Sequence, residues 1–382
     1  MKYRKFGSLD WNVSVLGFGV MRLPIIGTDT ANIDEPESIR MIRYAIDHGV
    51  NYVDTAYGYH RSKSEVLLGK ALKDGYREKV RLATKMPLWL VEKKESLDEL
   101  FNTQLDRLQT EYFDYYLLHN VNKEYWAKVE KFDILEWAGK KLKEGKIKYF
   151  GFSYHDDLDF FKKVVDSYDW TFCQIQLNYM DDEYQAGLEG LRYAADKGLA
   201  VVIMEPIKGG KLAVTPPKEV QAIWDKADVK RYPAEWALQW VWNLPEVSVV
   251  LSGMSNMQQV KENLTYADRS GPGTLKPYEL SLYKEVKDAY NKLGFVGCTA
   301  CQYCMPCPQM VDIPGILGQY NEFHLKGGGE EAKANYWDEI NPENHSSNCI
   351  ACGICEESCP QNLPIRKFMN ETARIFQKPE TE

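Results

Sequence analysis

The segment Val50–Glu65, VNYVDTAYGYHRSKSE, places polar side chains directly after a short apolar strand. Tyr52 and Val53 end that strand. Asp54 stands at its carboxyl end, and Tyr59 follows in a glycine-containing loop. A carboxylate and a phenol at a strand end are typical of an active site in a barrel of parallel strands. The same residues would also suit a helix cap and a packing ring, so the neighbouring strands must decide between the two interpretations.

Strands and helices alternate through the first 265 residues. After a hairpin of residues 2–6 and 12–15, eight strands are expected at residues 15–19, 52–54, 80–85, 113–118, 147–152, 172–177, 200–204 and 247–251. Apolar residues at helical spacing predict the helices between them, at residues 39–46, 66–72, 97–108, 126–143, 158–165, 188–197, 234–241 and 260–264. This alternation predicts a (β/α)8 barrel, an α/β fold of the TIM-barrel type. An open doubly wound sheet ranks behind it, because Gly17 and Gly19 lack the third glycine and the helix start of a dinucleotide-binding turn.

Composition narrows the classes of partner. The chain has 382 residues, is 44% hydrophobic and 27% charged, and carries a net charge of −8. The negative charge argues against nucleic acid or an anionic membrane surface as a general partner. No apolar run approaches the roughly 20 residues that span a bilayer, and residues 1–11 lack the apolar core of a signal peptide. We therefore expect a cytoplasmic protein.

Two more polar residues stand at the ends of the next two strands. Lys85 ends the strand RLATK, and His119 follows the strand FDYYLL. Adjacent parallel strands bring such positions together around one rim, so Asp54, Tyr59, Lys85 and His119 are expected to form one catalytic set. A nearby ammonium lowers the pKa of a tyrosine, and a carboxylate would hold that ammonium in place. The set therefore suits protonation of a carbonyl oxygen by Tyr59 while hydride arrives at carbon, with His119 orienting the oxygen or assisting the proton.

These motifs resemble the aldo/keto reductase family over residues 1–267. The resemblance rests on Asp54-Thr55-Ala56-x-x-Tyr59, Lys85, His119, Gly151-Phe152-Ser153, Gln174, Gly253-Met254-Ser255-Asn256 and Glu262-Asn263-Leu264. It implies a (β/α)8 barrel that binds NADP or NAD and reduces aldehydes and ketones, with Tyr59 as the proton donor. It also implies nucleotide contacts from Met21, Asp54, Ser153, Gln174, Met204, Ser255, Asn256, Gln259 and Asn263.

The chain departs from the family pattern at four positions. Tyr154 stands where an Asn is usual, Met204 where an aromatic ring is common, Glu205 where a Ser is common and Gln259 where an Arg often grips a 2′-phosphate. The choice between NADPH and NADH therefore stays open.

The glycine-rich turn after the seventh barrel strand is a further candidate for nucleotide binding. Lys208-Gly209-Gly210-Lys211 could cradle a pyrophosphate through its backbone amides, and its alternative is a flexible surface loop. Because the turn follows a barrel strand at the expected rim, we expect Gly209 and Gly210 to contact the cofactor.

Eight of the nine cysteines follow Gly297, in two runs that each end in Cys-Pro. The second run, Cys349-x2-Cys352-x2-Cys355-x3-Cys359-Pro360, has the spacing of bacterial ferredoxins, and the first is one residue shorter before its last cysteine. The runs predict two 4Fe–4S clusters; zinc is the alternative.

In two-cluster ferredoxins the fourth cysteine of each run ligates the other cluster. That pattern assigns one cluster to Cys298, Cys301, Cys304 and Cys359, which we name the first cysteine set. It assigns the other to Cys307, Cys349, Cys352 and Cys355, the second cysteine set. Cys173 is expected to be a buried apolar residue.

Three segments are thus expected: a barrel at 1–270, a linker and helix at 271–297, and a small helical ferredoxin-like domain at 298–382. Helices are predicted at residues 278–293, 313–325, 330–340 and 365–376. The leading interpretation is an oxidoreductase acting on a small carbonyl compound, with a ferredoxin or a flavoprotein as electron partner. A redox enzyme that does not use nicotinamide as its main donor, and a nucleotide-binding redox sensor, remain as alternatives. The clusters could form an electron relay or a structural cap.

Overall fold

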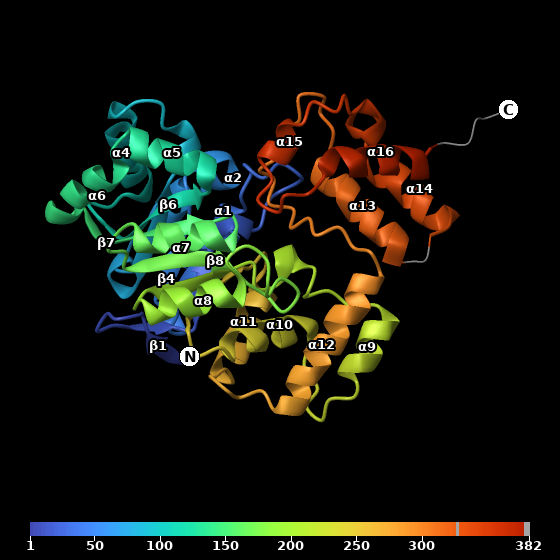
Figure 1. Ribbon diagram of the computed structural model, residues 1–382, viewed down its shortest axis with the longest axis horizontal. Coiled ribbons are helices and arrows are strands. Elements are labelled where there is room, and N and C mark those ends of the chain that lie inside the picture. Colours follow the sequence, from blue (N-terminus) through green and yellow to red (C-terminus); the bar gives the residue numbers. More distant parts are fainter. Residues whose placement is uncertain (326–327, 378–382) are drawn as a thin grey trace. The chain divides into compact units, whose positions relative to one another are not determined.

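The computed structural model describes residues 1–325 and 328–377 (Figure 1). Their contacts divide the chain into two compact units. The first comprises Met1–Pro206 and Glu235–Leu275, and the second comprises the segments from Ile207 to Ala234 and from Lys276 onward. The predicted boundaries at residues 270 and 297 remain a prediction. In the structure, the excursion 207–234 groups with the residues after 276.

The first unit is a closed barrel of eight parallel strands, which confirms the predicted fold. The strands are β3 (Leu16–Gly19), β4 (Tyr52–Asp54), β5 (Arg81–Met86), β6 (Phe113–Val121), β7 (Ile147–Tyr154), β8 (Phe172–Gln176), β9 (Ala200–Met204) and β10 (Val247–Gly253). Each strand pairs with the next, and β10 closes on β3. Because all strands run in one direction, their carboxyl ends share one rim, where a barrel enzyme carries its site.

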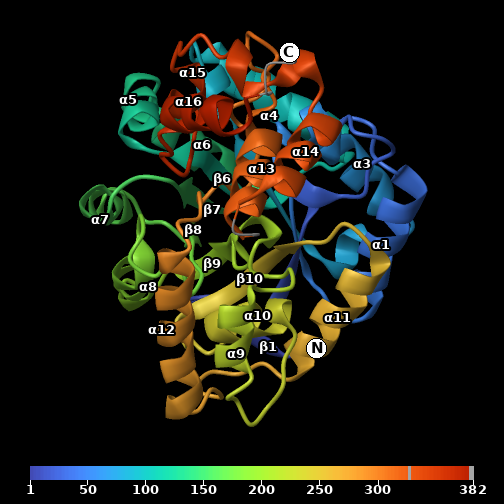
Figure 2. The same ribbon diagram turned by 90° about the vertical axis from the view of Figure 1, so that its right-hand side faces the viewer.

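Helices surround this barrel, and α1 and α11 lie next to each other on its outside (Figure 2). They are α1 (Glu35–Asp47), α2 (Tyr59–Ser62), α3 (Ser64–Ala71), α4 (Glu95–Leu108), α5 (Lys123–Lys131), α6 (Ile134–Lys143), α7 (Leu158–Asp166), α8 (Gly187–Asp196), α10 (Pro233–Trp242) and α11 (Met257–Asp268). Caps fix several of their starts: the Asp34, Asn122, Asp157 and Asn256 side chains each accept a backbone N–H in the first turn.

A single helix over residues 126–143 is a wrong prediction, because two helices occupy this stretch. Helix α5 ends at Lys131, and Asp133 adopts a left-handed backbone with φ of 53° before α6 begins at Ile134. A left-handed residue interrupts the helical hydrogen-bond ladder, so the chain turns there. The apolar periodicity on both sides conceals the break.

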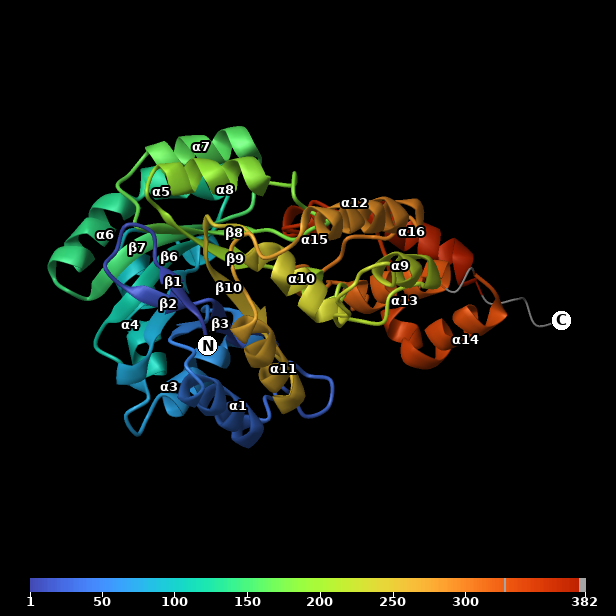
Figure 3. The same cartoon turned by 90° about the horizontal axis from the view of Figure 1, so that it is seen from below.

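A hairpin of β1 (Tyr3–Lys5) and β2 (Asn12–Ser14), seen in Figure 3, precedes the barrel as predicted. Phe6 follows β1 and packs on Tyr52, Tyr115 and Phe172, with ring centroids 4.7–6.0 Å apart. Tyr52 and Phe172 are the first residues of their strands. The hairpin segment therefore fills the amino-terminal end of the barrel and leaves the other rim for chemistry.

The second unit is helical. It contains α9 (Lys218–Trp224), α12 (Pro277–Lys292), α13 (Ile313–Leu325), α14 (Glu330–Glu339), α15 (Ile354–Glu357) and α16 (Ile365–Ile375). Helix α9, which the sequence did not predict, packs on α12 through Trp224 and Tyr283. A separate apolar core, which includes Ile316, Leu317 and Met369, packs against the cysteines. No helix among the described residues is both long and apolar enough to cross a membrane.

Candidate active site and cysteine cavities

Asp54, Lys85 and His119 come from three consecutive barrel strands and lie at one rim. Asp54 is the last residue of β4, Lys85 lies in β5 and His119 in β6. All three side chains are buried, Lys85 completely. The structure therefore brings together the residues that the sequence predicted as a set.

Lys85 is the centre of this group. Its Nζ donates to Asp54 Oδ1 at 2.6 Å and to the Thr55 carbonyl at 2.7 Å, and lies 3.5 Å from the Tyr59 hydroxyl. Burial lowers the pKa of Lys85, and the Asp54 charge opposes that shift. Burial likewise raises the pKa of Asp54, against the effect of Lys85. Each partner thus opposes the effect of burial on the other, in a site that penalises an isolated charge.

His119 lies beside the Tyr59 ring. Its ring meets the Tyr59 ring edge-on at 6.0 Å. Burial, followed by the charges of Lys85 and His155, places the pKa of His119 well below its usual range. The imidazole is therefore neutral at pH 7 and can both donate and accept a hydrogen bond.

An unusual turn holds Tyr59 in place. His60, Arg61 and Ser62 have φ of 51°, 49° and 68°, a left-handed run that non-glycine residues rarely adopt. The His60 ring lies within 2.7 Å of the Thr30 carbonyl through Nδ1 and accepts the Leu23 N–H at 3.2 Å through Nε2. These two bonds anchor the turn.

Two residues of the site lie in segments expected to set substrate specificity, 86–91 and 120–125, but were not singled out individually from the sequence. The Trp89 ring lies 5.0 Å from the His119 ring, on the loop after β5. Asn120 lies in an irregular part of β6 with φ of 59°, and its N–H donates to Ser153 Oγ at 2.8 Å. Both follow the polar strand residues Lys85 and His119, which was a usable signal, but neither belongs to a periodic apolar pattern that would identify it.

The residues expected at the nicotinamide, Ser153, Gln174 and Met204, lie on the neighbouring strands β7, β8 and β9. Gln174 Nε2 lies 3.5 Å from Met204 Sδ, and Gln174 Oε1 is buried without a hydrogen-bond partner among the described residues. Ser153 is buried and holds the Asn120 N–H. An orphaned buried acceptor beside a thioether fits a bound carboxamide, whose N–H₂ would satisfy it.

The residues expected at the adenosine end surround the start of α11. Ser255 Oγ donates to the carbonyl of Arg22, next to Met21 in the turn Val20–Arg22, and its N–H donates to Gln259 Oε1 at 2.7 Å. Asn256 caps α11. Asn263 is buried and donates to Ser252 Oγ at 3.0 Å, so this side chain is directed into the fold.

Gly209 and Gly210 lie in the second unit. A Cβ on Gly209 would stand 2.3 Å from the Thr299 carbonyl oxygen, whereas nothing lies within 4 Å of one on Gly210. Lys211 Nζ donates to the Val296 carbonyl at 2.9 Å. The turn thus packs on the segment before and after Cys298, a contact that the sequence did not predict.

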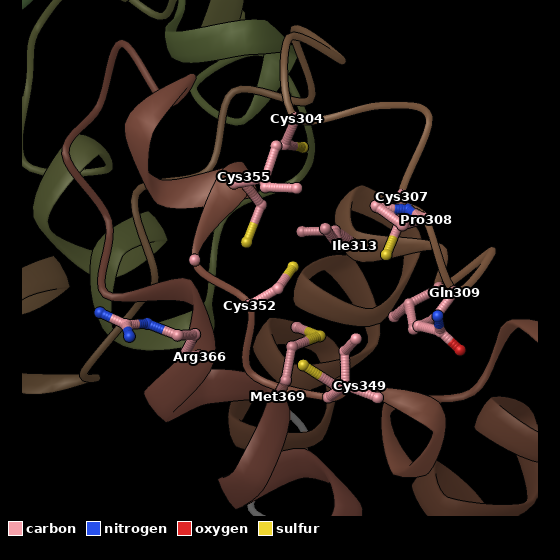
Figure 4. A pocket seen from close by; sticks show the side chains of 14 residues that line it. Cys304, Cys307, Pro308, Gln309, Ile313, Cys349, Cys352, Cys355, Arg366 and Met369 are labelled. Atoms are coloured by element: carbon pink, nitrogen blue, oxygen red, sulfur yellow. The ribbon is translucent and has the colours of Figure 1, made fainter.

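The eight predicted ligands line two cavities. All four cysteines of the second set line one cavity, together with Cys304 (Figure 4), and all four of the first set line the other. Figure 4 shows the sulfur atoms of the second set facing a common space. Among the described residues, no three His, Cys, Asp or Glu side chains converge on a single metal-ion position.

Backbone N–H groups also point at the cysteines. The Ala300 N–H lies 3.4 Å from Cys298 Sγ, and the Ala351 N–H lies 3.4 Å from Cys349 Sγ. Burial raises the pKa of Cys355 to about 11. Thiols so placed become thiolates when a metal binds, and N–H donors stabilise the sulfur charge. The donor sets therefore fit iron–sulfur clusters.

The barrel with its rim residues and the cysteine cavities together indicate a redox protein with two parts, a barrel and an iron–sulfur domain. Comparisons with known proteins agree with this interpretation. Residues 15–272 match the model of the Aldo/keto reductase family, and residues 297–363 match a 4Fe-4S dicluster domain. The chain belongs to the aldo/keto reductase family, is an oxidoreductase and carries an iron–sulfur domain.

Individual relatives are distant. L-galactose dehydrogenase of Arabidopsis thaliana is 28% identical over 69% of this chain and 87% of its own. Probable aldo-keto reductase 1 of Glycine max is 36% identical over 39% of this chain; the match spans 44% of that relative. Among solved structures, the holo form of aldo-keto reductase AKR11C1 from Bacillus halodurans is 28% identical. It matches with a TM-score of 0.61 over 75% of this chain and 96% of its own.

Proposed function

We propose that the barrel reduces an aldehyde or ketone to an alcohol with NADPH or NADH, and that Tyr59 supplies the proton. The bound nicotinamide would supply a hydride to the carbonyl carbon. The proton on the carbonyl oxygen then completes the alcohol, so one hydride and one proton are consumed for each carbonyl.

One observation carries this proposal: the buried ammonium of Lys85 lies between the Asp54 carboxylate and the Tyr59 hydroxyl. When Tyr59 gives up its proton, the ammonium stabilises the phenolate that remains, most strongly where water is excluded. Asp54 keeps the ammonium charged and in position. Together the three residues make a phenol act as an acid near neutral pH.

His119 and Trp89 are assigned to binding the substrate rather than to transferring the proton. A neutral His119 beside Tyr59 can donate to the carbonyl oxygen and orient it. Trp89 lies against His119 and offers an aromatic surface to the carbon skeleton.

The nucleotide side of the proposal is supported by the unpaired Gln174 acceptor and by the loop at the start of α11. The same helix start carries no arginine or lysine in its first turn, because Met257, Gln258 and Gln259 occupy it. A 2′-phosphate would find no guanidinium in that turn, so these contacts do not favour NADPH over NADH.

The test replaces Tyr59 with Phe and uses Tyr57→Phe as a matched control in the same loop. Loss of the proton donor should lower kcat for aldehyde reduction by about 10²- to 10⁴-fold. NAD(P)H binding, followed by fluorescence titration, should stay within twofold. The control should retain its activity. Unchanged turnover in Tyr59→Phe would refute the assignment. Tight NAD(P)H binding without turnover of any carbonyl in wild type would favour a nucleotide-binding redox sensor instead.

We further propose that the iron–sulfur domain exchanges single electrons with a ferredoxin or a flavoprotein. The supporting observation is the presence of two separate four-cysteine cavities, since one would suffice as a structural staple. Two clusters, each holding one electron, would together hold two electrons, as many as one hydride carries.

A further inference from the structure

The two cysteine loops, Cys298–Cys304 and Cys349–Cys355, repeat one backbone conformation. In each, the residue before the second cysteine is a left-handed alanine: Ala300 with φ of 50° and Ala351 with φ of 55°. In each, this alanine's N–H approaches the first cysteine's sulfur at 3.4 Å. The residue after the second cysteine is also left-handed, Gln302 in one loop and Gly353 in the other. Because the two loops are locally equivalent, differences in their surroundings are informative.

The first loop is covered by the chain itself. Thr299, which follows its first cysteine, is 2% exposed. Its backbone packs on Gly209 so closely that an added Cβ would overlap it, and Lys211 binds the carbonyl of Val296 just before the loop. These contacts come from the segment that leaves barrel strand β9 after Met204.

The second loop is open at the equivalent positions. Ile350, the counterpart of Thr299, is 62% exposed, and Ile354, the counterpart of Tyr303, is 50% exposed. Cys352 between them is exposed as well. All three line the cavity of the second cysteine set. The two exposed isoleucines and the exposed predicted ligand Cys352 therefore form one small apolar surface at the cavity of the second cysteine set.

We propose that Ile350 and Ile354 form the docking surface for a one-electron carrier protein, which passes its electrons to the cluster of the second cysteine set. The proposal rests on the electron-transfer role proposed above and names where that exchange occurs. In each event the reduced carrier loses one electron and the cluster gains it, with no bond made or broken.

The character of the surface indicates its occupant. The charged side chain that lines the cavity, Arg366, is paired with Glu356 at 2.7 Å, so the side chains around the cysteines are mostly apolar and add little net charge. An electron carrier with its redox group near an apolar, uncharged patch complements such a rim. Two isoleucines and a cysteine offer too little area for a stable dimer, but enough for the brief encounters of electron-transfer proteins.

The experiment uses the full chain with both clusters, prepared without oxygen. Stopped-flow absorbance follows cluster bleaching by reduced ferredoxin, by reduced flavodoxin and by reduced methyl viologen, a small donor that needs no docking surface. In Ile350→Lys and Ile354→Lys, we expect the rates with the protein carriers to fall at least tenfold, and the viologen rate to stay within twofold. Val229→Lys, at another exposed apolar residue of the same unit, is the matched control and should change neither rate.

Four outcomes would overturn the proposal. In the first, both lysine variants are bleached by the protein carriers at the wild-type rate. In the second, the variants are slowed equally with viologen and with the protein carriers. In the third, viologen bleaches the clusters of the wild-type chain but neither protein carrier does. In the fourth, the wild-type chain is a dimer that either substitution dissociates. The last would make a second copy of this chain the occupant. If viologen itself fails to bleach the clusters, the broader electron-transfer proposal fails instead. Carbonyl turnover does not enter any of these measurements, so the role of Tyr59 is tested separately.

Discussion

His60 shows how one side chain can position a catalytic neighbour without touching substrate. Its ring accepts the Leu23 N–H and lies against the Thr30 carbonyl, which requires the neutral form with its proton on Nδ1. Burial lowers the pKa of His60, and the charge of Arg22 contributes in the same direction. The left-handed turn that begins at His60, and with it the backbone of Tyr59, therefore depends on an uncharged imidazole.

We predict that His60→Ala lowers kcat at pH 7.5 more than it raises KM, because Tyr59 is misplaced while the nucleotide contacts remain. Leaving the buried Leu23 N–H unpaired should cost about 1–3 kcal/mol of unfolding free energy in urea. His48→Ala, at an exposed histidine, is the control. An unchanged kcat would show that the turn holds Tyr59 without this ring.

The same residue predicts a pH dependence. His60 has a lower pKa folded than unfolded, so the unfolded chain binds more protons as the pH falls below about 6.5, its ordinary value. Its contribution to stability is therefore present at pH 7.5 and lost on acidification. Urea melts between pH 7.5 and 5.5 give the unfolding free energy at each pH. This free energy should fall less steeply with acidification in His60→Ala than in wild type.

At the scale of elements, periodic segments were predictable and non-periodic ones were not. The eight strands were recognised from their apolar runs, and the site residues Asp54, Lys85 and His119 from their places after those runs. The continuation of β6 through Asn120 was missed, because a left-handed residue inside a strand has no sequence period. The break at Asp133 had a signal, since an Asp followed three residues later by Glu136 is typical of a helix start.

The turn Lys208–Gly210 (η4) is the element whose role remains most open. The sequence favours contact with a pyrophosphate, and the structure packs Gly209 on Thr299 beside the first cysteine set. The two glycines separate these roles, because both have positive φ but only Gly209 is crowded.

We predict that Gly209→Ala lowers iron content toward half of the wild-type value, since its Cβ displaces Thr299 and the loop that follows. Gly210→Ala is also strained by its φ of 97°, but it should retain its iron, because its Cβ meets open space and leaves Thr299 in place. Iron and sulfide analysis of anaerobic preparations checks both. Full iron with weakened NAD(P)H binding in both variants would instead favour the pyrophosphate role.

At the scale of the whole molecule, each unit has its own core. The barrel core is built on Phe6, Tyr52 and Tyr115, whereas that of the second unit is packed against its cysteines. The excursion 207–234 leaves one unit to join the other, a long-range association that no local pattern predicts. The cysteine spacing, by contrast, was readable because ligand geometry constrains neighbours in sequence.

The final prediction asks whether the iron–sulfur domain is a relay or a structural cap. Cys355→Ala removes one ligand of the second cysteine set and should lose that cluster, while the first set, with Cys359, keeps its own. Cys173→Ala is the matched control, because Cys173 is fully buried in barrel strand β8 and burial raises its pKa. In a relay, Cys355→Ala should reduce carbonyls at the wild-type rate with NAD(P)H and lose at least nine-tenths of its rate with ferredoxin or viologen.

Electron paramagnetic resonance would count the remaining clusters, and circular dichroism would check the helices. If the variant folds and keeps full activity with every donor, electrons do not pass through this cluster. Its cysteines then serve only to hold α13, α15 and α16 together.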